Sequence, residues 1–175
     1  MANILIIYST TDGHTKKICS TMQTQLIAKG DDVKLVSVTS ANTEELESFD
    51  KLVVGASIRY GKHSKQVRSF VSANKGALDS KPNAFFSVNV VARKPEKNTP
   101  ETNPYISKFL EQVPWRPKHL GVFAGVINYQ IYGFFDRMMI RFIMWMTKGP
   151  TDPSSNVEFT DWARVDEFAT LIHEM

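Results

Sequence analysis

The sequence predicts an α/β domain in which helices cover both faces of a parallel, five-stranded sheet. Five short apolar runs recur along the 175 residues, and amphipathic helical patterns lie between them. Nearly continuous apolar runs are typical of strands buried on both faces, and right-handed crossovers then place the intervening helices on the two sides. This length suits one sizeable core, so we expect residues 1–175 to form a single doubly wound domain.

Each strand is placed by its apolar run. The first run covers residues 3–8, and the others are expected at 33–38, 52–56, 84–90 and 120–126. A helical pattern follows the first run and stops at Gly30, because glycine commonly ends helices. Its apolar face consists of Ile18, Cys19, Met22 and Leu26. Two further helices are expected through Val67, Phe70 and Val71 and through Tyr105, Ile106, Phe109 and Leu110.

The alternation of strands and helices is interrupted after the fifth strand. Residues 127–156 are expected to form an insertion, because a stretch rich in Tyr, Phe and Met separates this strand from the last helical pattern. Pro150 and Pro153 mark the loop that leaves the insertion. The terminal helix is expected over 160–175, and the pair Thr160-Asp161 can cap its start.

Composition excludes several classes of protein. Hydrophobic residues make up 42% and charged residues 22%, which excludes disordered, collagen-like and coiled-coil chains. A single Cys excludes a disulfide scaffold, and the N-terminus does not resemble an export signal, so we expect a cytoplasmic protein. Residues 150–175 hold six acids and one base, a charge of −5, which leaves +8 for residues 1–149 of the net +3.

A binding site is expected at one end of the sheet. In doubly wound sheets, ligands bind outside the carboxyl ends of the strands, where the strand order reverses. The loops that follow the first, third and fourth strands are therefore the candidates. They begin at Ser9, at Ser57 and at Ser87 or Asn89.

The first of these loops has the composition of a phosphate-binding loop that lacks cations. It consists of Ser9, Thr10, Thr11, Asp12, Gly13, His14 and Thr15. Its hydroxyls and the N-terminus of the following helix can donate hydrogen bonds to an anion, and a neutral loop suits a phosphate monoester such as that of a mononucleotide. Ordinary helix capping is the alternative, and Asp12 opposes an anion.

The second and third loops add an aromatic ring and positive charge. The second consists of Ser57, Ile58, Arg59, Tyr60 and Gly61. Stacking on Tyr60 beside a cation would suit a flavin, while a solvated loop is the alternative. The third begins with Ser87, Val88 and Asn89 and continues into a basic segment. Convergence of three such loops favours a ligand site.

Other phosphate and metal sites do not fit the sequence. Gly55 to His63 differs from a Walker loop in its glycine spacing, and His63 replaces the hydroxyl that binds magnesium. The first strand lacks the glycine fingerprint of dinucleotide-binding folds. Cys19 lies on an apolar helix face, where burial is expected rather than phosphatase chemistry. The four His residues have no metal-like spacing, so no metal is expected.

Three segments carry a resemblance to a known family. The run from Ser87 to Lys97, which reads Ser-Val-Asn-Val-Val-Ala-Arg-Lys-Pro-Glu-Lys, is the most specific, and residues 55–61 and the triplet Thr160-Asp161-Trp162 accompany it. The first loop is similar to a flavodoxin phosphate loop, one residue longer than the common S/T-x-T-G-x-T form. Across nearly its whole length the chain resembles the flavodoxin-like, quinone-dependent protoporphyrinogen IX dehydrogenases of bacterial haem synthesis.

The resemblance implies a cofactor, a reaction and a set of site residues. It implies that FMN binds non-covalently at the three loops, and that protoporphyrinogen IX is oxidised to protoporphyrin IX while a membrane quinone, menaquinone or ubiquinone, accepts the electrons. The first loop would hold the phosphate, and the other two would flank the ribityl chain and isoalloxazine. Arg59 and Arg93 are expected to contact the reduced flavin or the substrate propionates, with solvent exposure as the alternative. No side chain is assigned as a catalytic acid or base.

The insertion contains a basic amphipathic helix over residues 132–148. Its charges interrupt the apolar run too often for a membrane span, whereas Trp and Phe beside Arg suit a bilayer surface. We therefore expect peripheral association with the cytoplasmic face of the inner membrane. Packing on the domain or on a second subunit is the alternative. The residues expected to contact substrate or an anionic membrane are Arg93, Arg137, Arg141, Phe142 and Trp145.

Two related functions stay open at this point. A flavodoxin electron carrier would share the fold and FMN, but such carriers are typically acidic, whereas residues 1–149 are basic. A flavodoxin-fold NAD(P)H:quinone reductase is the closer alternative. No nucleic-acid partner is expected, and a homo-oligomer is left open.

Overall fold

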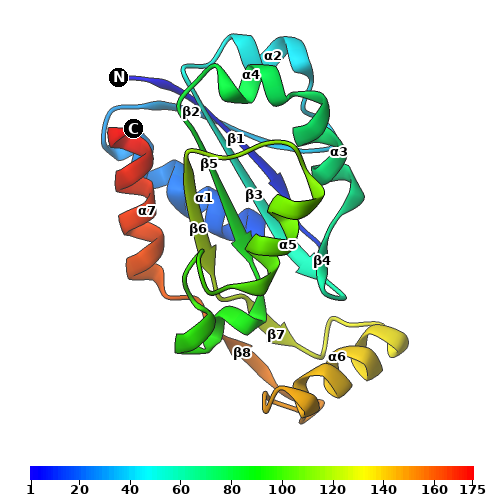
Figure 1. Cartoon of the computed structure of the whole chain (residues 1–175). Coiled ribbons are helices and arrows are strands. Elements are labelled where there is room, and N and C mark those ends of the chain that lie inside the picture. The colour runs from blue at the N-terminus through cyan, green and yellow to red at the C-terminus, as the bar shows by residue number, and fades with distance from the viewer.

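The five parallel strands form one sheet with the order β2-β1-β3-β5-β6 (Figure 1). This computed structural model describes residues 1–175. The order reverses between β1 and β3, so the predicted doubly wound sheet is confirmed, and the carboxyl ends of these strands lie at the reversal. The strands are β1 (Asn3–Ser9), β2 (Asp32–Ser37), β3 (Lys51–Arg59), β5 (Asn83–Val88) and β6 (His119–Phe123).

Helices cover both faces of the sheet. Alternate residues of β1 divide between the faces, with Ile4 and Ile6 in one buried cluster and Leu5 and Ile7 in the other. The first cluster is closed by α1 (His14–Ala28) and α7 (Trp162–Glu174). The second is closed by α2 (Thr43–Glu47), α3 (Lys65–Ala73), α4 (Lys75–Asp79) and α5 (Pro104–Gln112).

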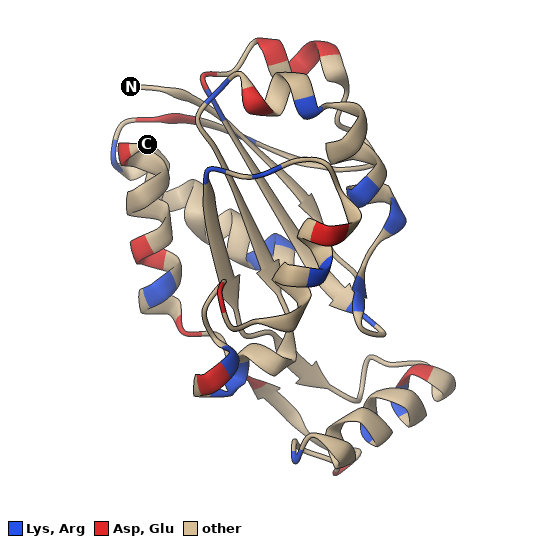
Figure 2. Cartoon of the chain, viewed as in Figure 1, with Lys and Arg blue, Asp and Glu red and all other residues tan.

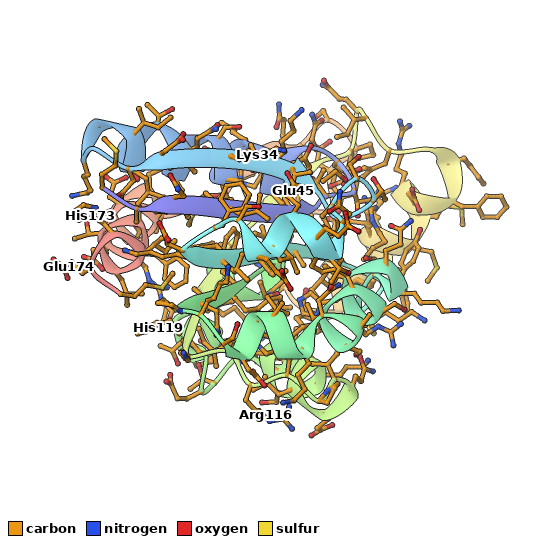
Figure 3. The ribbon with its side chains drawn as sticks, turned by 90° about the horizontal axis from the view of Figure 1, so that it is seen from above. Lys34, Glu45, Arg116, His119, His173 and Glu174 are labelled. Carbon is orange, nitrogen blue, oxygen red and sulfur yellow. The ribbon has the colours of Figure 1, made fainter.

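Strands β2 and β6 form the two edges of the sheet. Figure 3 shows Lys34 of β2 at one edge, where its ammonium pairs with Glu45 of α2, and His119 of β6 at the other. Figure 2 shows acidic and basic residues next to one another on α7 and near the insertion.

The first helix agrees with the sequence in detail. Ile18, Cys19, Met22 and Leu26 are fully buried, and Gly30 ends the helix with φ of +97°. Burial raises the pKa of the Cys19 thiol, so it stays protonated and acts as a small apolar side chain. At the other end of the chain, the Asp161 carboxylate accepts a hydrogen bond from the Ala163 amide and caps α7 as expected.

Two strand ends differ from the prediction. The third strand continues to Arg59 and turns back through Tyr60 and Gly61, both with positive φ, into β4 (Lys62–His63). Ser57 to Arg59 are thus strand residues, because Ser57 pairs with Val88 of β5 and the hairpin pairs the two residues after it with β4. The fifth strand ends at Phe123 instead of Val126, and the fourth ends at Val88, followed by the short helices η1 (Val90–Arg93) and η2 (Pro95–Lys97).

The insertion is a ribbon that carries one helix. The antiparallel strands β7 (Val126–Asn128) and β8 (Asn156–Glu158) form the ribbon, and α6 (Phe134–Met146) lies beyond it, next to the carboxyl ends of the sheet (Figure 1). The Tyr129 side chain is fully buried against Tyr132, and its hydroxyl donates to the Pro150 carbonyl at 2.6 Å. None of the helices has the length and apolar content that a transmembrane helix requires.

The two arginines on the basic side of α6 are exposed and donate to backbone carbonyls. Arg137 donates from Nε to the Tyr129 carbonyl at 3.2 Å, and Arg141 donates from Nε to the Thr151 carbonyl at 2.7 Å. These bonds satisfy backbone oxygens of the loops at either end of the helix. The sequence did not indicate these bonds, because a helical spacing alone does not show which loop carbonyls lie within reach. Contact of Arg137 and Arg141 with substrate or an anionic membrane stays a prediction.

One glycine is required by close packing. A Cβ at Gly55 of β3 would stand 2.2 Å from the Phe86 ring, whereas a Cβ at Gly76 of α4 would meet nothing within 4 Å. We expect Gly55→Ala to lower the free energy of unfolding by about 2 kcal/mol through overpacking. Gly76→Ala is the matched control and should raise it by about 0.5 kcal/mol through helix propensity. Urea denaturation measures both, and equal values for the two variants would contradict this packing argument.

Candidate functional site

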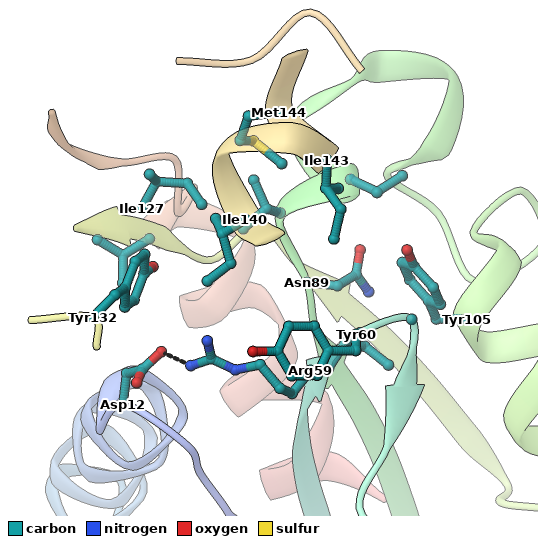
Figure 4. A pocket seen from close by; sticks show the side chains of 15 residues that line it. Asp12, Arg59, Tyr60, Asn89, Tyr105, Ile127, Tyr132, Ile140, Ile143 and Met144 are labelled. Atoms are coloured by element: carbon teal, nitrogen blue, oxygen red, sulfur yellow. Dashed lines mark hydrogen bonds and ion pairs between the residues drawn. The ribbon is translucent and has the colours of Figure 1, made fainter. Parts of the chain in front are cut away.

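The three predicted loops meet in one cleft at the carboxyl ends of β1, β3 and β5. The cleft has two cavities that adjoin, since both are lined by Asp12, Ile58, Asn89, Val90 and Val126. We call them the polar arm and the apolar arm. The other residues of the polar arm are Thr10, Thr11, His14, Thr15, Ser57, Val88 and Gly125. Those that distinguish the apolar arm are chiefly Tyr60, Tyr105, Tyr132, Ile140, Ile143 and Met144 (Figure 4).

The polar arm leaves hydrogen-bond donors free at the start of α1. Gly13 precedes the helix with φ of +90°, and no side chain caps its first turn. The Thr15 hydroxyl is buried and has no hydrogen-bond partner. Helix amides without a cap and an unpaired hydroxyl are the groups that a phosphate accepts from. The donor set of this arm therefore fits a phosphate monoester.

Three hydroxyls of the first loop also make contacts within the protein. The Ser9 hydroxyl lies 3.2 Å from the hydroxyl of Ser64, at the start of α3, and Ser9 does not line the cleft. The Thr10 hydroxyl accepts from the Gly13 amide at 2.9 Å and so shapes the turn. Thr11 reaches the second loop, with its hydroxyl 3.4 Å from that of Ser57.

His14 connects the polar arm to the end of the insertion. Its Nε2 lies 2.6 Å from the Thr160 hydroxyl, and its Nδ1 lies 3.7 Å from the Glu158 carboxylate. Burial lowers the pKa of His14, so the neutral imidazole is favoured. Glu158 also accepts from Lys17 at 2.9 Å. The sequence did not indicate these contacts, because about 145 residues separate the partners.

Arg59 lies at the centre of the cleft. Its guanidinium pairs with Asp12 of the first loop, and its Nη1 lies 3.9 Å from the Asp136 carboxylate of α6 (Figure 4). It also lies 5.4 Å from the centre of the Tyr132 ring, within the range of a cation–π contact. One residue thus joins the first loop, the hairpin and the insertion. The pairing offsets the negative charge of Asp12, which otherwise opposes an anion in the polar arm.

The third loop is supported by a chain of buried polar side chains. The Asn89 amide donates to the Ser87 hydroxyl at 3.1 Å and exchanges hydrogen bonds with the amide of Asn103. His63 lies behind them with Nε2 2.8 Å from the Ser87 hydroxyl, and burial lowers its pKa to about 3. The Asn89 oxygen also accepts from the Ala92 amide and caps η1. These bonds engage the Asn89 side chain in holding the loop.

Arg93 anchors the insertion instead of facing the cleft. Its Nη2 donates to the Thr147 carbonyl at 2.9 Å at the end of α6, and its Nη1 donates to the Val90 carbonyl at 3.0 Å. A cation at the C-terminus of a helix also complements the helix dipole. The expectation that Arg93 contacts flavin or substrate is therefore replaced by a structural role that its place in a basic run did not reveal.

The apolar arm is closed by the inner face of α6. Ile140, Ile143 and Met144 line it, whereas Phe142 and Trp145 are 52% and 70% exposed on the outer face of the same helix. The sequence singled out the outer residues because they are aromatic. The inner residues share a helical spacing of three and four, which is the signal that marks them as a face.

Fold and cleft together define a flavodoxin-type protein. A family model described as flavodoxin domain matches residues 5–154. In overall structure the chain is similar to oxidised Flavodoxin 2 from Bacillus cereus, with a TM-score of 0.58 at 17% identity over 99% of both chains. It is also similar to a short-chain flavodoxin associated with a non-canonical PDU bacterial microcompartment, with a TM-score of 0.59 over 99% of this chain and 98% of that one.

Curated sequences place the chain more narrowly. It is 44% identical over 168 residues to a protein of Escherichia coli K12 named protoporphyrinogen IX dehydrogenase (quinone), covering 96% of this chain and 93% of that protein. It is 46% identical over 170 residues to a protein of the same name from Leishmania major, covering 95% of this chain and 72% of that one. The chain therefore belongs to the flavodoxin family and, within it, to the protoporphyrinogen IX dehydrogenase (quinone) family.

The cofactor of this family fits the donors of the cleft. Family membership indicates FMN. The residues that would hold its phosphate are Thr10, Thr11 and Thr15 with the amides at the start of α1, since they form the uncapped polar arm. The assignment of single residues of the three loops to parts of the cofactor stays a prediction.

The unpaired hydroxyl of Thr15 allows a direct test. We expect Thr15→Val to weaken FMN binding about tenfold, because a hydrogen bond to a charged group is lost. The FMN-free protein should keep its stability or gain some, since the variant removes a buried hydroxyl without a partner. Quenching of FMN fluorescence and thermal denaturation measure the two effects.

Thr24→Val is the matched control for this prediction. Thr24 lies in the same helix, and its hydroxyl donates to the Ser20 carbonyl in solvent. Its replacement should leave FMN affinity unchanged. An affinity of Thr15→Val equal to that of the control would contradict a phosphate site at this hydroxyl.

Proposed function

We propose that this protein oxidises protoporphyrinogen IX to protoporphyrin IX with FMN as cofactor and a membrane quinone as electron acceptor, the penultimate step of haem synthesis. The observation that supports this most is the union of the two arms of the cleft. A polar arm suited to a phosphate opens into an apolar arm lined by three tyrosines and the inner face of α6. Such a cleft can hold a mononucleotide together with a large apolar ring system.

The chain's own residues orient the reactants. When bound, FMN supplies two-electron redox chemistry between the reduced macrocycle and the quinone. Each step removes two hydrogens from the macrocycle and adds two to a quinone, which becomes the quinol. Tyr60, Tyr105 and Tyr132 would lie along the ring system, and the Arg59 guanidinium, paired with Asp12, lies between the arms. The inner face of α6, formed by Ile140, Ile143 and Met144, would exclude water from the apolar arm.

Turnover tests the proposal directly. We expect anaerobic oxidation of protoporphyrinogen IX by the FMN-loaded protein to continue only when quinone is added. Porphyrinogen, but not NADPH, should bleach the absorbance of bound flavin in stopped flow. Bleaching by NADPH but not by porphyrinogen would replace this function with an NAD(P)H:quinone reductase. Transfer of electrons to a partner protein without porphyrinogen oxidation would indicate an electron carrier.

The outer face of α6 supports contact with an anionic bilayer, where quinones reside. Phe134, Phe135 and Trp145 are 73%, 80% and 70% exposed. Aromatic side chains on one face of a short helix suit the interface between headgroups and acyl chains. Because the inner face of the same helix lines the apolar arm, this placement would bring the cleft close to the membrane surface.

Vesicle binding tests the membrane contact. We expect Phe135→Gln with Trp145→Gln to lower co-sedimentation with vesicles of phosphatidylglycerol and phosphatidylcholine about tenfold, since two exposed apolar side chains are lost. These changes test the contact better than Arg137→Glu and Arg141→Glu, which would also break bonds to loop carbonyls. Ile27→Gln, on the exposed side of α1, is the control. Equal recovery of both variants would overturn the contact.

A further inference from the structure

Two lysines stand at the rim of the apolar arm, beside the turn between β3 and β4. Gly61 lines the cavity, and Lys62 follows it directly. The Lys108 ammonium of α5 donates to the Gly61 carbonyl at 3.0 Å. Tyr105, one turn earlier on α5, lines the cavity too. Two cations from different elements are thus gathered at one point of the rim.

The hairpin register directs Lys62 toward the cleft. Arg59 and Lys62 are paired across the antiparallel strands, and paired residues project their side chains from the same face. Figure 4 shows the Arg59 side chain extending across the cleft toward Asp12. The Lys62 side chain, which is exposed, therefore leaves the hairpin on the cleft side.

Both lysines lack an acidic partner. The salt bridges of the chain engage Lys17, Lys34, Lys75, Arg59 and two histidines, and neither Lys62 nor Lys108 lies within 4 Å of a carboxylate. The bond to Gly61 uses one of the three donor hydrogens of Lys108, which leaves two. Figure 2 shows basic residues at the hairpin and on α5. The rim thus holds positive charge available to a ligand.

An apolar cavity with free cations at one edge suits an apolar ring that carries carboxylates on one side. We propose that Lys62 and Lys108 bind the substrate's carboxylates and so orient it, with its apolar body under α6. This inference rests on the proposed function, because protoporphyrinogen IX carries its two propionates along one edge. A quinone has no carboxylate, so the same lysines would distinguish the substrate from the electron acceptor.

Charge reversal tests the inference. The double variant Lys62→Glu with Lys108→Glu, loaded with FMN, is titrated with protoporphyrin IX and with its dimethyl ester in one nonionic detergent. We expect binding of the dicarboxylate to weaken about tenfold at low salt, and less at high salt, because exposed charges are screened. Binding of the ester and of FMN should stay unchanged. In turnover, KM for the porphyrinogen should rise, while KM for the quinone and kcat stay near those of the unaltered protein.

Two further variants sharpen the result. Lys62→Arg with Lys108→Arg keeps the charge and should keep most of the affinity. Lys29→Glu reverses one exposed lysine at the far end of α1 and should change nothing.

Three outcomes would overturn the inference. The first is equal loss of dicarboxylate and ester, which would mean that the apolar arm itself was damaged. The second is unchanged porphyrin binding with weaker binding to anionic vesicles, which would assign the lysines to lipid headgroups. The third is a failure of the protein without substitutions to bind either protoporphyrin IX or its ester. This result would overturn both the inference and the proposed function.

Discussion

Parallel pairing of β1 with β2 on one side and β3 on the other is the constraint on which the site depends. The register pairs Ser9 with Ala56 and Ser57 with Val88, so the ends of three strands reach one level at the edge of the sheet. β1 leads through a turn to α1 on one face, whereas β3 and β5 lead through the β4 hairpin and the short helices η1 and η2 to α3 and α5 on the other. The reversal of strand order between β1 and β3 separates those helices and leaves a cleft between the turns.

The insertion completes this cleft because it leaves β6 and leads into α7 at the end of the sheet where the strands terminate (Figure 1). Its own core is small, with four buried side chains, Ile127, Tyr129, Tyr132 and Met144. A helix of 13 residues with most of its apolar side chains in solvent does not hold its place by burial alone. Arginine side chains also hold the helix in place. Arg93 bonds to its C-terminal end and Arg59 lies near its first turn, while Arg137 and Arg141 bond the helix to the adjoining loops.

Individual residues show how far sequence reasoning reaches. Periodicity placed Cys19 and Met22 in the core, and both are fully buried. The first loop was identified from its hydroxyls and glycine, and Thr10, Thr11 and Thr15 do line the polar arm. Arg93 was misread because a basic run does not reveal a carbonyl some 54 residues away. Ile140 and Ile143 were passed over because neither stands out chemically from the apolar residues around it.

The sequence by itself determined what local patterns encode. Apolar runs specify buried strands, helical periodicity specifies which side of α1 packs inward, and hydroxyls before a helix specify a polar loop. The resemblance of residues 87–97, together with residues 55–61 and 160–162, indicated the family to which the chain belongs. The tertiary structure decided where the cations lie and what they contact. Arg59 pairs with Asp12, and three other arginines donate to carbonyls around the insertion, namely Arg93, Arg137 and Arg141. Lys62 and Lys108 come from different elements to the rim of the apolar arm and have no acidic partner there. The partner of a long, flexible side chain depends on which carboxylates and carbonyls the fold brings within a few ångströms. A local sequence pattern does not predict these groups.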